Sequence, residues 1–462
     1  MAARTIAVIL AGGIGERGGF SRPKQLVKLA GRPVISHALG RFETHESIDE
    51  ICIVTNELCR SDIEDLVSRE RFTKVKRILL GGAERYDSSL AAIRAYERDA
   101  GDGELLILFH DAVRPLVSHA VIDDVLKALK HYDAVDVAIR VTDTVIQANP
   151  KTNTIESIPD RSLLRLGQTP QGFRFETIRE AYERALKDPQ FVTTDDCGVV
   201  VKYMPETPVF IVDGDASNLK LTFPADLMII DKFMQSNAGR RLNANAETLL
   251  LSRLRDAHVA IIGGTSGIGE AMAKLAQAYG AKVSVAGRST GFDVGNGAQV
   301  ERWFAEAREK EGRIDAVVNT AAILDRQPLM SMTLDQIRTS IETNFLGAAN
   351  VAWAARPHLA ETRGHLIFFA SSSYTYGRAL YSTYSASKAA VVNLTQALSD
   401  EWSELGIKVN CINPERARTP MRTKAFGNEP ADTLLDPDDV ARRALSVLVG
   451  NTSGIIYDIV RT

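Results

Sequence analysis

A glycine-rich loop past the midpoint of the chain has the residues of a phosphate-binding turn. Residues 263–269 read G-G-T-S-G-I-G, after an apolar run over 258–262 and before a helix-like run over 270–279. Glycines permit a tight turn that brings backbone amides close to a phosphate, and the N-terminus of the following helix favours negative charge. Because the spacing is G-x-x-x-G-x-G rather than G-x-G-x-x-G, the loop alone is compatible with either a phosphate site or a simple tight turn.

The residues downstream of this loop could bind a nicotinamide dinucleotide and carry out a reduction. Arg288 follows a strand predicted over 281–286, where an acidic residue would bind the ribose 2′-hydroxyl and an arginine suits a 2′-phosphate. Tyr384 and Lys388 are four residues apart, so they share one face of a predicted helix, and Ser371 lies 13 residues before Tyr384. Because a lysine cation lowers the pKa of a neighbouring tyrosine, we expect Tyr384 to donate a proton near neutral pH.

The start of the chain carries another glycine-rich loop, with residues suited to nucleotidyl transfer. Residues 10–17 read L-A-G-G-I-G-E-R, and residues 23–25 read P-K-Q. Arg17 and Lys24 could neutralise phosphate charge there, and the loop lacks the G-K-[ST] ending of a P-loop. Asp111 comes at the end of a predicted strand, where a carboxylate can hold Mg²⁺ together with phosphate oxygens. Lys220 lies in a later polar loop and completes this set.

The elements that position these residues alternate between apolar strand-like runs and helical patterns, which predicts an α/β fold with largely parallel sheets. In the first half the predicted strands cover residues 6–10, 50–54, 75–80, 105–109 and 134–139. The predicted helices between them cover residues 33–44, 61–70, 88–99 and 119–131. The pattern stops in a polar stretch and restarts at residue 259. We therefore predict two domains, residues 1–233 and 256–462, joined by a linker over 234–255 that ends in a short helix.

The length and the composition limit the classes of protein to which this chain can belong. A length of 462 residues allows roughly two to four domains. With 45% hydrophobic residues, 24% charged residues and a net charge of -3, the chain has the balance of a soluble globular protein and no basic surplus that would favour nucleic acid or an anionic membrane as a partner. The four cysteines are scattered without metal-ligand spacing, which favours buried thiols in a reducing compartment. We expect a cytoplasmic protein, because no apolar run reaches about 18 residues and the N-terminus enters a strand at once.

The first half of the chain resembles the family of 2-C-methyl-D-erythritol 4-phosphate cytidylyltransferases and their ribitol-5-phosphate cytidylyltransferase relatives. Five motifs carry the resemblance in order: L-A-G-G-x-G-x-R with P-K-Q, G-G-x-x-R-x-x-S, H-D-A-x-R-P and T-P-Q-x-F. The resemblance implies a nucleotidyltransferase-type, Rossmann-like α/β domain with a β-arm over residues 142–161. It also implies a homodimer in which a partner subunit supplies an arm residue.

This first resemblance assigns roles to individual residues. Arg17 and Lys24 would stabilise the pentavalent phosphorus, and Asp111 would hold Mg²⁺. The residues implied to bind CTP are Ala11, Gly12, Gly13, Gly82, Arg85 and Ser88. The residues implied to face the phosphate of the acceptor are Thr144, Arg161 and Lys220, with Arg161 coming from the partner subunit.

The second half, residues 256–462, resembles the short-chain dehydrogenase/reductase family, which implies an NADP-binding Rossmann domain. In that family's pattern Tyr384 is the general acid, Lys388 tunes it and holds the nicotinamide ribose, and Asn344 completes a proton relay. Ser371 hydrogen-bonds the substrate carbonyl, with Ser372 as the alternative. The residues implied to bind NADPH are Gly263, Thr265, Ser266, Gly267, Ile268, Gly269, Arg288, Asp293 and Asn319.

The second half departs from the family pattern at three places. Ile262 replaces the usual threonine before the first glycine, N-T-A-A at 319–322 replaces N-N-A-G, and Pro414-Glu415 replaces Pro-Gly near the nicotinamide. A run of four cations follows the last of these, and it could be either a solvated surface or a clamp for a phosphorylated substrate. These cations are Arg416, Arg418, Arg422 and Lys424.

Together, the two halves resemble bifunctional CDP-ribitol-forming enzymes of bacterial capsule or cell-wall pathways. That resemblance implies reduction of D-ribulose 5-phosphate with NADPH in the second domain, followed by cytidylyl transfer from CTP to ribitol 5-phosphate in the first. One alternative is a 2-C-methyl-D-erythritol 4-phosphate cytidylyltransferase of isoprenoid synthesis fused to a reductase of another substrate. Another alternative, of a different class, is a scaffold or regulatory sensor that binds both nucleotides without turnover.

Overall fold

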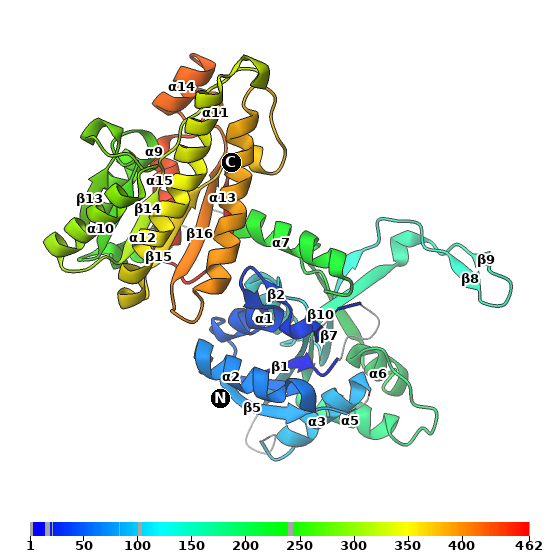
Figure 1. The fold of residues 1–462 in the computed structure, drawn as a ribbon. Coiled ribbons are helices and arrows are strands. Elements are labelled where there is room, and N and C mark those ends of the chain that lie inside the picture. The colour runs from blue at the N-terminus through cyan, green and yellow to red at the C-terminus, as the bar shows by residue number, and fades with distance from the viewer. Residues whose placement is uncertain are drawn as a thin grey trace. The chain divides into compact units, whose positions relative to one another are not determined.

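The structure is a computed structural model that describes residues 3–13, 19–20, 22–82, 84–99, 104–238 and 244–461. The chain divides into two compact units, Met1–Asp231 and Lys232–Thr462 (Figure 1). Each unit contains one central β-sheet with helices on both faces, as the alternation of apolar runs and helical patterns predicted.

The first unit is built on a seven-stranded sheet with the order β11-β7-β10-β6-β1-β4-β5. Six strands run in the same direction, and β10 is antiparallel to both of its neighbours, β6 and β7. The strands of this sheet are β1 (Arg4–Ala11), β4 (Glu50–Thr55), β5 (Val75–Leu80), β6 (Leu105–Asp111), β7 (Ala134–Arg140), β10 (Arg165–Arg174) and β11 (Val209–Asp213). The five predicted strands are therefore present. The T-P-Q-x-F motif lies on β10, which the apolar pattern did not predict as a strand.

Helices cover both faces of this sheet because its strands are apolar on both sides. In β1, Ala7 and Ile9 pack on one face, and Ile6 and Val8 pack on the other. The helices that supply the two cores are α1 (Val34–Glu43), α2 (Arg60–Glu70) and α4 (His119–Ala128) on one face, and α3 (Arg85–Tyr96), α5 (Phe175–Ala185) and α6 (Asp196–Tyr203) on the other. Short elements complete the unit: β2 (Lys28–Leu29), β3 (Arg32–Pro33), η2 (Lys24–Leu26) and η3 (Glu57–Cys59).

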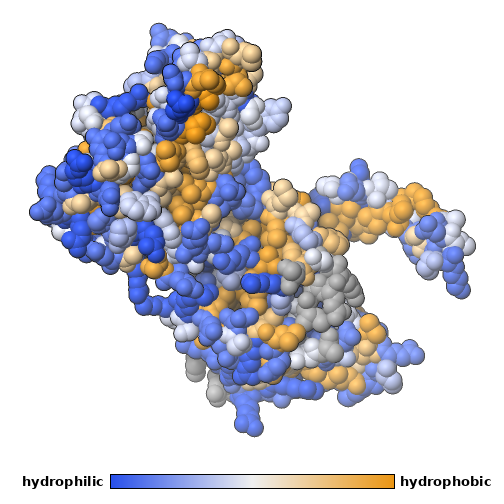
Figure 2. Space-filling view, viewed as in Figure 1, coloured by the Kyte–Doolittle hydropathy of each residue, from blue (hydrophilic) through white to orange (hydrophobic). Residues whose placement is uncertain are grey.

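An arm projects from the first unit between β7 and β10 (Figure 1). It contains the antiparallel hairpin of β8 (Gln147–Asn149) and β9 (Thr154–Ser157), followed by the short helix η5 (Arg161–Leu163). Figure 2 shows hydrophobic residues along this arm. Its large exposed apolar side chains are Val145, Ile146, Ile155, Ile158, Leu163 and Leu166. The predicted β-arm is thus present, and it carries apolar surface that nothing in its own chain covers among the described residues.

The second unit has a six-stranded parallel sheet with the order β13-β12-β14-β15-β16-β17. Its strands are β12 (His258–Ile262), β13 (Lys282–Ala286), β14 (Ala316–Asn319), β15 (His365–Phe369), β16 (Lys408–Pro414) and β17 (Ile456–Ile459). The strand order reverses at β12, since β13 lies on one side of it and β14 on the other. In open α/β sheets such a reversal leaves a crevice at the carboxyl ends of the strands.

Helices enclose this second sheet as well. One face packs on α10 (Gly297–Glu311), α12 (Gly347–Thr362) and α13 (Ser382–Glu401), and α9 (Gly267–Ala278) and α15 (Pro437–Leu448) pack together in the same unit. The shorter elements of this unit are α11 (Leu334–Ile341), η7 (Arg288–Thr290), η8 (Leu329–Ser331), the π-helical turn η9 (Glu342–Leu346), η10 (Ser372–Tyr374), α14 (Pro420–Phe426) and η11 (Ala431–Thr433).

The stretch 234–255, predicted as a linker, is largely helical where the structure describes it. It contains the end of α7 (Pro224–Ala238), the helix α8 (Ala244–Leu251) and the turn η6 (Ser252–Leu254). Leu251 and Leu254 are fully buried, because this stretch packs within the second unit rather than bridging through solvent. The short helix expected from residue 246 is therefore part of a folded unit.

Two further expectations concern the chain as a whole. All four cysteines are free and buried, as their apolar surroundings suggested. Among the described residues, none of the helices combines the length and the apolar character needed to cross a membrane.

Candidate active sites

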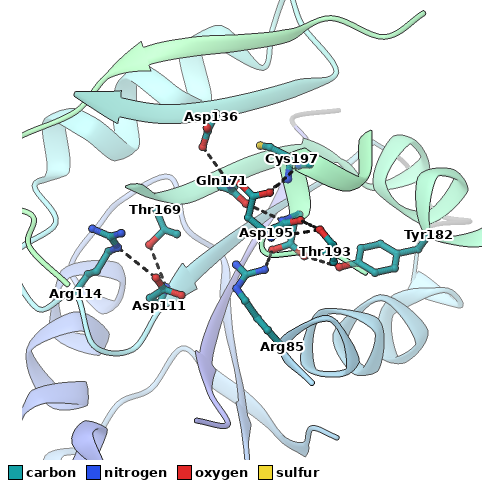
Figure 3. A network of polar contacts seen from close by, with 12 residues as sticks. Arg85, Asp111, Arg114, Asp136, Thr169, Gln171, Tyr182, Thr193, Asp195 and Cys197 are labelled. Carbon is teal, nitrogen blue, oxygen red and sulfur yellow. Dashed lines mark hydrogen bonds and ion pairs between the residues drawn. The ribbon is translucent and has the colours of Figure 1, made fainter. Parts of the chain in front are cut away.

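Asp111, the last residue of β6, is the centre of a charged cluster in the first unit (Figure 3). Its Oδ2 atom lies 3.0 Å from Lys220 Nζ and 3.3 Å from Arg114 Nε. Burial alone would raise the pKa of this carboxyl, but the charges of Lys220, Arg85 and Arg114 hold it well below its ordinary value. Asp111 is therefore a permanent anion at the edge of the sheet where the strands end.

Lys24, in the turn η2, belongs to the same cluster. Burial lowers the pKa of its ammonium group, and the neighbouring charge of Lys220 lowers it further, while Asp111 and Asp226 oppose the change. The ammonium groups of Lys24 and Lys220 repel each other, and the single carboxylate of Asp111 does not balance both charges. A phosphate group bound beside them would reduce this repulsion. Sequence reasoning thus brought Lys24, Asp111 and Lys220 together correctly. Arg17, the other predicted phosphate-binding cation, lies outside the described residues.

The glycine loops beside this cluster pack against the first turn of α3. A Cβ atom at Gly82 would lie 2.5 Å from Asp87 Cβ, so this position needs glycine, and one at Gly12 would lie 3.0 Å from Ser88 Oγ, a tight approach to that hydroxyl. The backbone carbonyl of Ala11 accepts a 2.8 Å hydrogen bond from Gln25 Nε2. The two loops therefore meet around Ser88, while among the described residues no heavy atom lies within 4 Å of a Cβ built at Gly13.

Arg85, which was predicted to bind CTP, makes an ion pair within the first unit. Its Nη1 atom lies 2.9 Å from Asp196 Oδ2, and Asp196 is fully buried and also accepts a 2.7 Å hydrogen bond from the Tyr182 hydroxyl (Figure 3). The charge of Asp196 raises the pKa of Arg85 despite the opposing effect of burial. This guanidinium neutralises a buried carboxylate and so links α3 to α6, and its role in CTP binding stays a prediction.

Two of the predicted acceptor-phosphate residues are separate from the cluster within one chain. Thr144 and Arg161 lie exposed on the arm, and Arg161 Nη1 donates a 3.0 Å hydrogen bond to the backbone carbonyl of Thr142. In the described part of the chain, neither Thr144 nor Arg161 contacts Lys24, Asp111 or Lys220. Of the three predicted acceptor residues, the structure brings only Lys220 to the cluster.

Arg114 is a site residue that the sequence reasoning left without a role. It donates to Asp111, to the carbonyl of Asn218 at 2.8 Å and to the carbonyl of Gly167 at 3.3 Å. It therefore ties the end of β6 to β10 and to the loop that carries Lys220. Arg114 is the arginine of the H-D-A-x-R-P motif, and this motif was the sequence feature that could have identified it as a site residue.

Mg²⁺ requires oxygen ligands and commonly takes one or two carboxylates together with substrate phosphates and water. Among the described residues no group of three or more acidic, histidine or cysteine side chains could enclose a metal ion. Asp111 offers one ionised carboxylate beside cations that suit a triphosphate, and only its Oδ2 atom is engaged by Lys220 and Arg114. This arrangement fits an ion that is held mainly by the nucleotide and by one protein carboxylate.

The glycine loop of the second unit has the geometry of a dinucleotide cradle. Gly263 has a φ of +80°, and a Cβ there would lie 2.6 Å from the amide nitrogen of Ala321. A Cβ at Gly269 would lie 2.5 Å from the carbonyl oxygen of Gly263. Helix α9 begins at Gly267, three residues before the predicted start, and its N-cap residue Ser266 makes no side-chain capping bond. The amides of the first turn therefore remain available to a pyrophosphate.

A cavity of about 690 Å³ extends from this loop across the carboxyl ends of the strands. Its lining includes the predicted cofactor residues Gly263, Thr265, Ser266, Gly267, Ile268, Gly269, Arg288 and Asp293. Arg288 is exposed and has no side-chain partner in the described part of the chain, so its charge is free to meet an anion. Asn319 is buried behind the lining, where its Oδ1 atom accepts a 3.1 Å hydrogen bond from the amide of Ala321. It shapes the turn that Gly263 packs against.

The same cavity contains Ser371, Tyr384 and Lys388. Ser371 is close enough to Tyr384 to lower the pKa of its hydroxyl, whereas Ser372 lines the cavity as an exposed residue, so the geometry favours Ser371 over the alternative serine. The expected lowering of the Tyr384 pKa by Lys388 is not found. Burial raises the pKa of Tyr384 to about 12, and Lys388 instead donates a 2.7 Å hydrogen bond to the carbonyl of Phe369.

Asn344 lies in the π-helical turn η9 and is buried. Its Nδ2 atom donates to the carbonyl of Ile323 at 2.9 Å, and its Oδ1 atom accepts from the amide of Ile323 at 2.8 Å. The side chain therefore fixes the backbone that follows β14, and it does not itself line the cavity. Single π-helical turns frequently occur at functional sites, which agrees with this location.

Comparisons with known proteins cover both units. Residues 5–236 match the family described as 2-C-methyl-D-erythritol 4-phosphate cytidylyltransferase, and residues 289–430 match the family described as short chain dehydrogenase. The bifunctional ribulose 5-phosphate reductase/CDP-ribitol pyrophosphorylase Bcs1 of Haemophilus influenzae is 45% identical over 457 residues, which are 99% of this chain and 96% of that protein. The 2-C-methyl-D-erythritol 4-phosphate cytidylyltransferase of Thermobifida fusca is 42% identical over 240 residues, 51% of this chain and 96% of that protein.

Proposed function

This chain belongs to the family of bifunctional ribulose 5-phosphate reductase/CDP-ribitol pyrophosphorylases, and on that premise we propose that it makes CDP-ribitol in two steps. The second unit reduces D-ribulose 5-phosphate to D-ribitol 5-phosphate with NADPH. The first unit then transfers the cytidylyl group of CTP to ribitol 5-phosphate and releases pyrophosphate. The observation that carries the proposal is similarity along the whole chain to one relative that has both activities in its name, with a nucleotide site in each unit.

In the reductase step, bound NADPH supplies a hydride to the carbonyl carbon of the substrate. The loop 263–269 would hold the pyrophosphate, Arg288 the 2′-phosphate, and Asp293 the adenine end. Ser371 would hydrogen-bond the carbonyl oxygen, and Tyr384 would give that oxygen its proton as negative charge develops. A tyrosine with a pKa of about 12 is protonated at neutral pH, so it carries the proton that this step consumes. Lys388 would hold the nicotinamide ribose.

In the transferase step, a phosphate oxygen of ribitol 5-phosphate attacks the α-phosphorus of CTP, the bond to the β-phosphate breaks, and pyrophosphate leaves. Lys24 and Lys220, with Arg17, would neutralise the charge on the transferred group. Asp111 would hold a Mg²⁺ ion that shields the triphosphate. Position and charge neutralisation account for the chemistry, so no covalent intermediate is required.

The arm provides the basis for a homodimer. Its exposed apolar side chains include Ile155, Ile158 and Leu163, and in the described part of the chain its Arg161 makes no contact with Lys24, Asp111 or Lys220. We infer that two copies exchange arms, so that Arg161 and Thr144 reach the transferase site of the partner. The reductase unit is a second candidate surface for association. Sedimentation of the intact protein beside a variant lacking residues 145–160 tests this: the intact chain should sediment as a dimer, and loss of the arm should abolish transferase activity.

The decisive experiment for the proposed function is incubation of the full chain with CTP, NADPH, Mg²⁺ and D-ribulose 5-phosphate, with mass detection of CDP-ribitol. Omission of NADPH should prevent product formation, and added D-ribitol 5-phosphate should restore it without NADPH. A preference for 2-C-methyl-D-erythritol 4-phosphate as acceptor would support the isoprenoid alternative, and binding of both nucleotides without turnover would support a sensor. The product would serve capsule or cell-wall polymer synthesis in the bacterial cytoplasm, where CTP and NADPH are available.

A further inference from the structure

Beyond Tyr384, the cavity of the second unit is lined by Arg378, Arg416 and Arg422. Among its described lining residues the acidic side chains are Asp293, near Arg288 at the nucleotide end, and Glu415. Glu415 accepts a 3.2 Å hydrogen bond from the backbone amide of Arg461. This part of the lining, defined here as the arginine end, has three guanidinium groups and one carboxylate, and so a surplus of positive charge.

Arg422 is held in one orientation at this arginine end. Its Nε atom lies 2.6 Å from Glu429 Oε2 and its Nη2 atom lies 2.9 Å from Glu429 Oε1, while the guanidinium lies 4.4 Å from the centre of the Phe426 ring. These contacts leave the Nη1 donors unused. The charge of Arg422 also acts on Tyr384, lowering its pKa against the larger rise caused by burial. Arg422 is thus a fixed cation close to the group that would donate the proton.

Arg416 and Arg378 differ from Arg422, because neither guanidinium has a hydrogen-bond or ion-pair partner in the described part of the chain. Arg416 follows Pro414-Glu415, the departure noted in the sequence, and its charge acts on Glu429, which Arg422 also binds. Only Arg422 is in contact with that carboxylate, and Arg416 acts on it from a distance. An unpaired guanidinium beside a partly neutralised one is the arrangement expected around a dianion that is absent from the free protein.

The predicted run of four cations therefore divides into two pairs. Arg418 lies 2.6 Å from Asp436, and Lys424 is exposed; neither lines the cavity. Arg416 and Arg422 both line it. The two alternatives left open by the sequence therefore both apply, one to each pair: Arg416 and Arg422 line the cavity, and Arg418 and Lys424 do not.

We infer that Arg416 and Arg422 bind the phosphate group of the sugar phosphate whose carbonyl is reduced, an inference that rests on the proposed reductase activity. When the carbonyl group of the substrate lies beside Tyr384 and Ser371, the phosphate at the other end of the short sugar chain reaches the arginine end. The fixed fork of Arg422 offers parallel N–H donors, and Arg416 supplies the second charge that a phosphate dianion requires. Glu429 is a positioning residue that orients Arg422.

The test measures NADPH oxidation with D-ribulose 5-phosphate and with D-ribulose, which lacks the phosphate. Arg422→Gln and Arg416→Gln should each raise KM for D-ribulose 5-phosphate about tenfold to a hundredfold. Arg416→Gln should leave kcat/KM for D-ribulose within about twofold, and both variants should keep the affinity for NADPH within about twofold. Arg418→Gln, in the same segment but outside the cavity, is the matched control and should leave KM unchanged. Retained NADPH binding shows that each variant has folded.

The outcomes separate this inference from the proposed function. An unchanged KM for D-ribulose 5-phosphate in both variants overturns the inference, and so does an equal loss on both substrates, which would place the arginines in the chemistry or the fold. Lack of NADPH oxidation by the unaltered protein with D-ribulose 5-phosphate, although NADPH binds, refutes the proposed function and the inference with it. A selective rise in KM supports both.

Discussion

The ammonium nitrogen of Lys388 lies 2.7 Å from the backbone carbonyl oxygen of Phe369, the last residue of β15. This hydrogen bond directs the lysine toward the end of the central sheet, 5.6 Å from the centre of the Tyr384 ring. Burial lowers the pKa of Lys388 to about 8, so the free protein keeps a cation there at neutral pH with little margin. Lys388 is therefore placed to hold a bound group at the strand end rather than to ionise Tyr384.

Because Lys388 is buried, the free energy of unfolding should depend on pH in the alkaline range. The pKa of Lys388 is about 8 in the folded protein and 10.5 in its ordinary state, so between these values the unfolded chain retains a proton that the folded chain has released. The free energy of unfolding should then rise with pH across this window, by up to about 1.4 kcal/mol per pH unit. Urea unfolding from pH 7.5 to 10.5 checks this against Lys388→Met. A parallel rise in the variant would contradict the assignment.

Tyr384→Phe should separate the two activities. The substitution keeps the buried ring and removes the proton donor, so the rate of NADPH oxidation with D-ribulose 5-phosphate should fall about 10²-fold to 10⁴-fold. CDP-ribitol formation from supplied D-ribitol 5-phosphate should be unchanged, since Tyr384 belongs to the second unit. Steady-state assays of both reactions on one preparation measure this. Loss of both activities would argue against two independent sites.

Lys24→Met should have the reverse effect. Lys24 contributes one of the charges that would stabilise the phosphorus during transfer, and its removal should lower kcat for cytidylyl transfer about 10²-fold to 10³-fold. Reduction of D-ribulose 5-phosphate should continue at the unaltered rate. Pyrophosphate release and NADPH oxidation, followed separately, provide the measurement. Normal transfer in this variant would remove Lys24 from the site.

Arg288→Ala should alter the choice between dinucleotides. Its exposed guanidinium lines the nucleotide end of the cavity and has no side-chain partner among the described residues, so an added 2′-phosphate is its expected ligand. The Kd for NADPH should rise about tenfold to a hundredfold, while that for NADH stays within about twofold. Fluorescence titration with both dinucleotides tests this. Equal weakening would show that Arg288 does not recognise the 2′-phosphate.

Arg85→Gln should affect stability more than substrate binding. Removal of the guanidinium leaves Asp196 buried without its ionic partner, which should cost about 3–5 kcal/mol of the free energy of unfolding of the first unit. Arg94→Gln, an exposed position on the same helix α3, is the matched control and should change it by less than about 0.5 kcal/mol. Urea unfolding measures both variants. Unaltered stability with a raised KM for CTP would restore the substrate-binding role.

The sequence allowed much of the fold to be predicted because apolar runs identify buried strands and because chemistry collects where parallel strands end. Lys24, Asp111 and Lys220 meet for that reason, as do the loop 263–269 and Tyr384. The spacing of residues along the sequence cannot show which side chains from distant elements contact each other. The pairing of Arg85 with Asp196 depends on how α3 packs beside α6, and the direction of Lys388 depends on the carbonyl of Phe369.

Strand β10 escaped prediction for a related reason. It contains Gly167, Pro170 and Gly172, so it lacks a continuous apolar run, yet pairing on both sides holds it in the sheet. Its register against β7 shifts between Gln168 and Gly172. Tertiary hydrogen bonding, rather than local preference, decides its conformation.

The continuity of β10 gives the arm a mechanical connection to the first active site. The strand begins at Arg165, directly after the arm, and reaches Thr169, whose Oγ1 atom accepts a 3.1 Å hydrogen bond from the amide of Asp111. The arm and the residue that bonds the backbone amide of Asp111 therefore belong to one continuous strand. A partner subunit that binds this arm would therefore bind next to the strand that also positions Asp111.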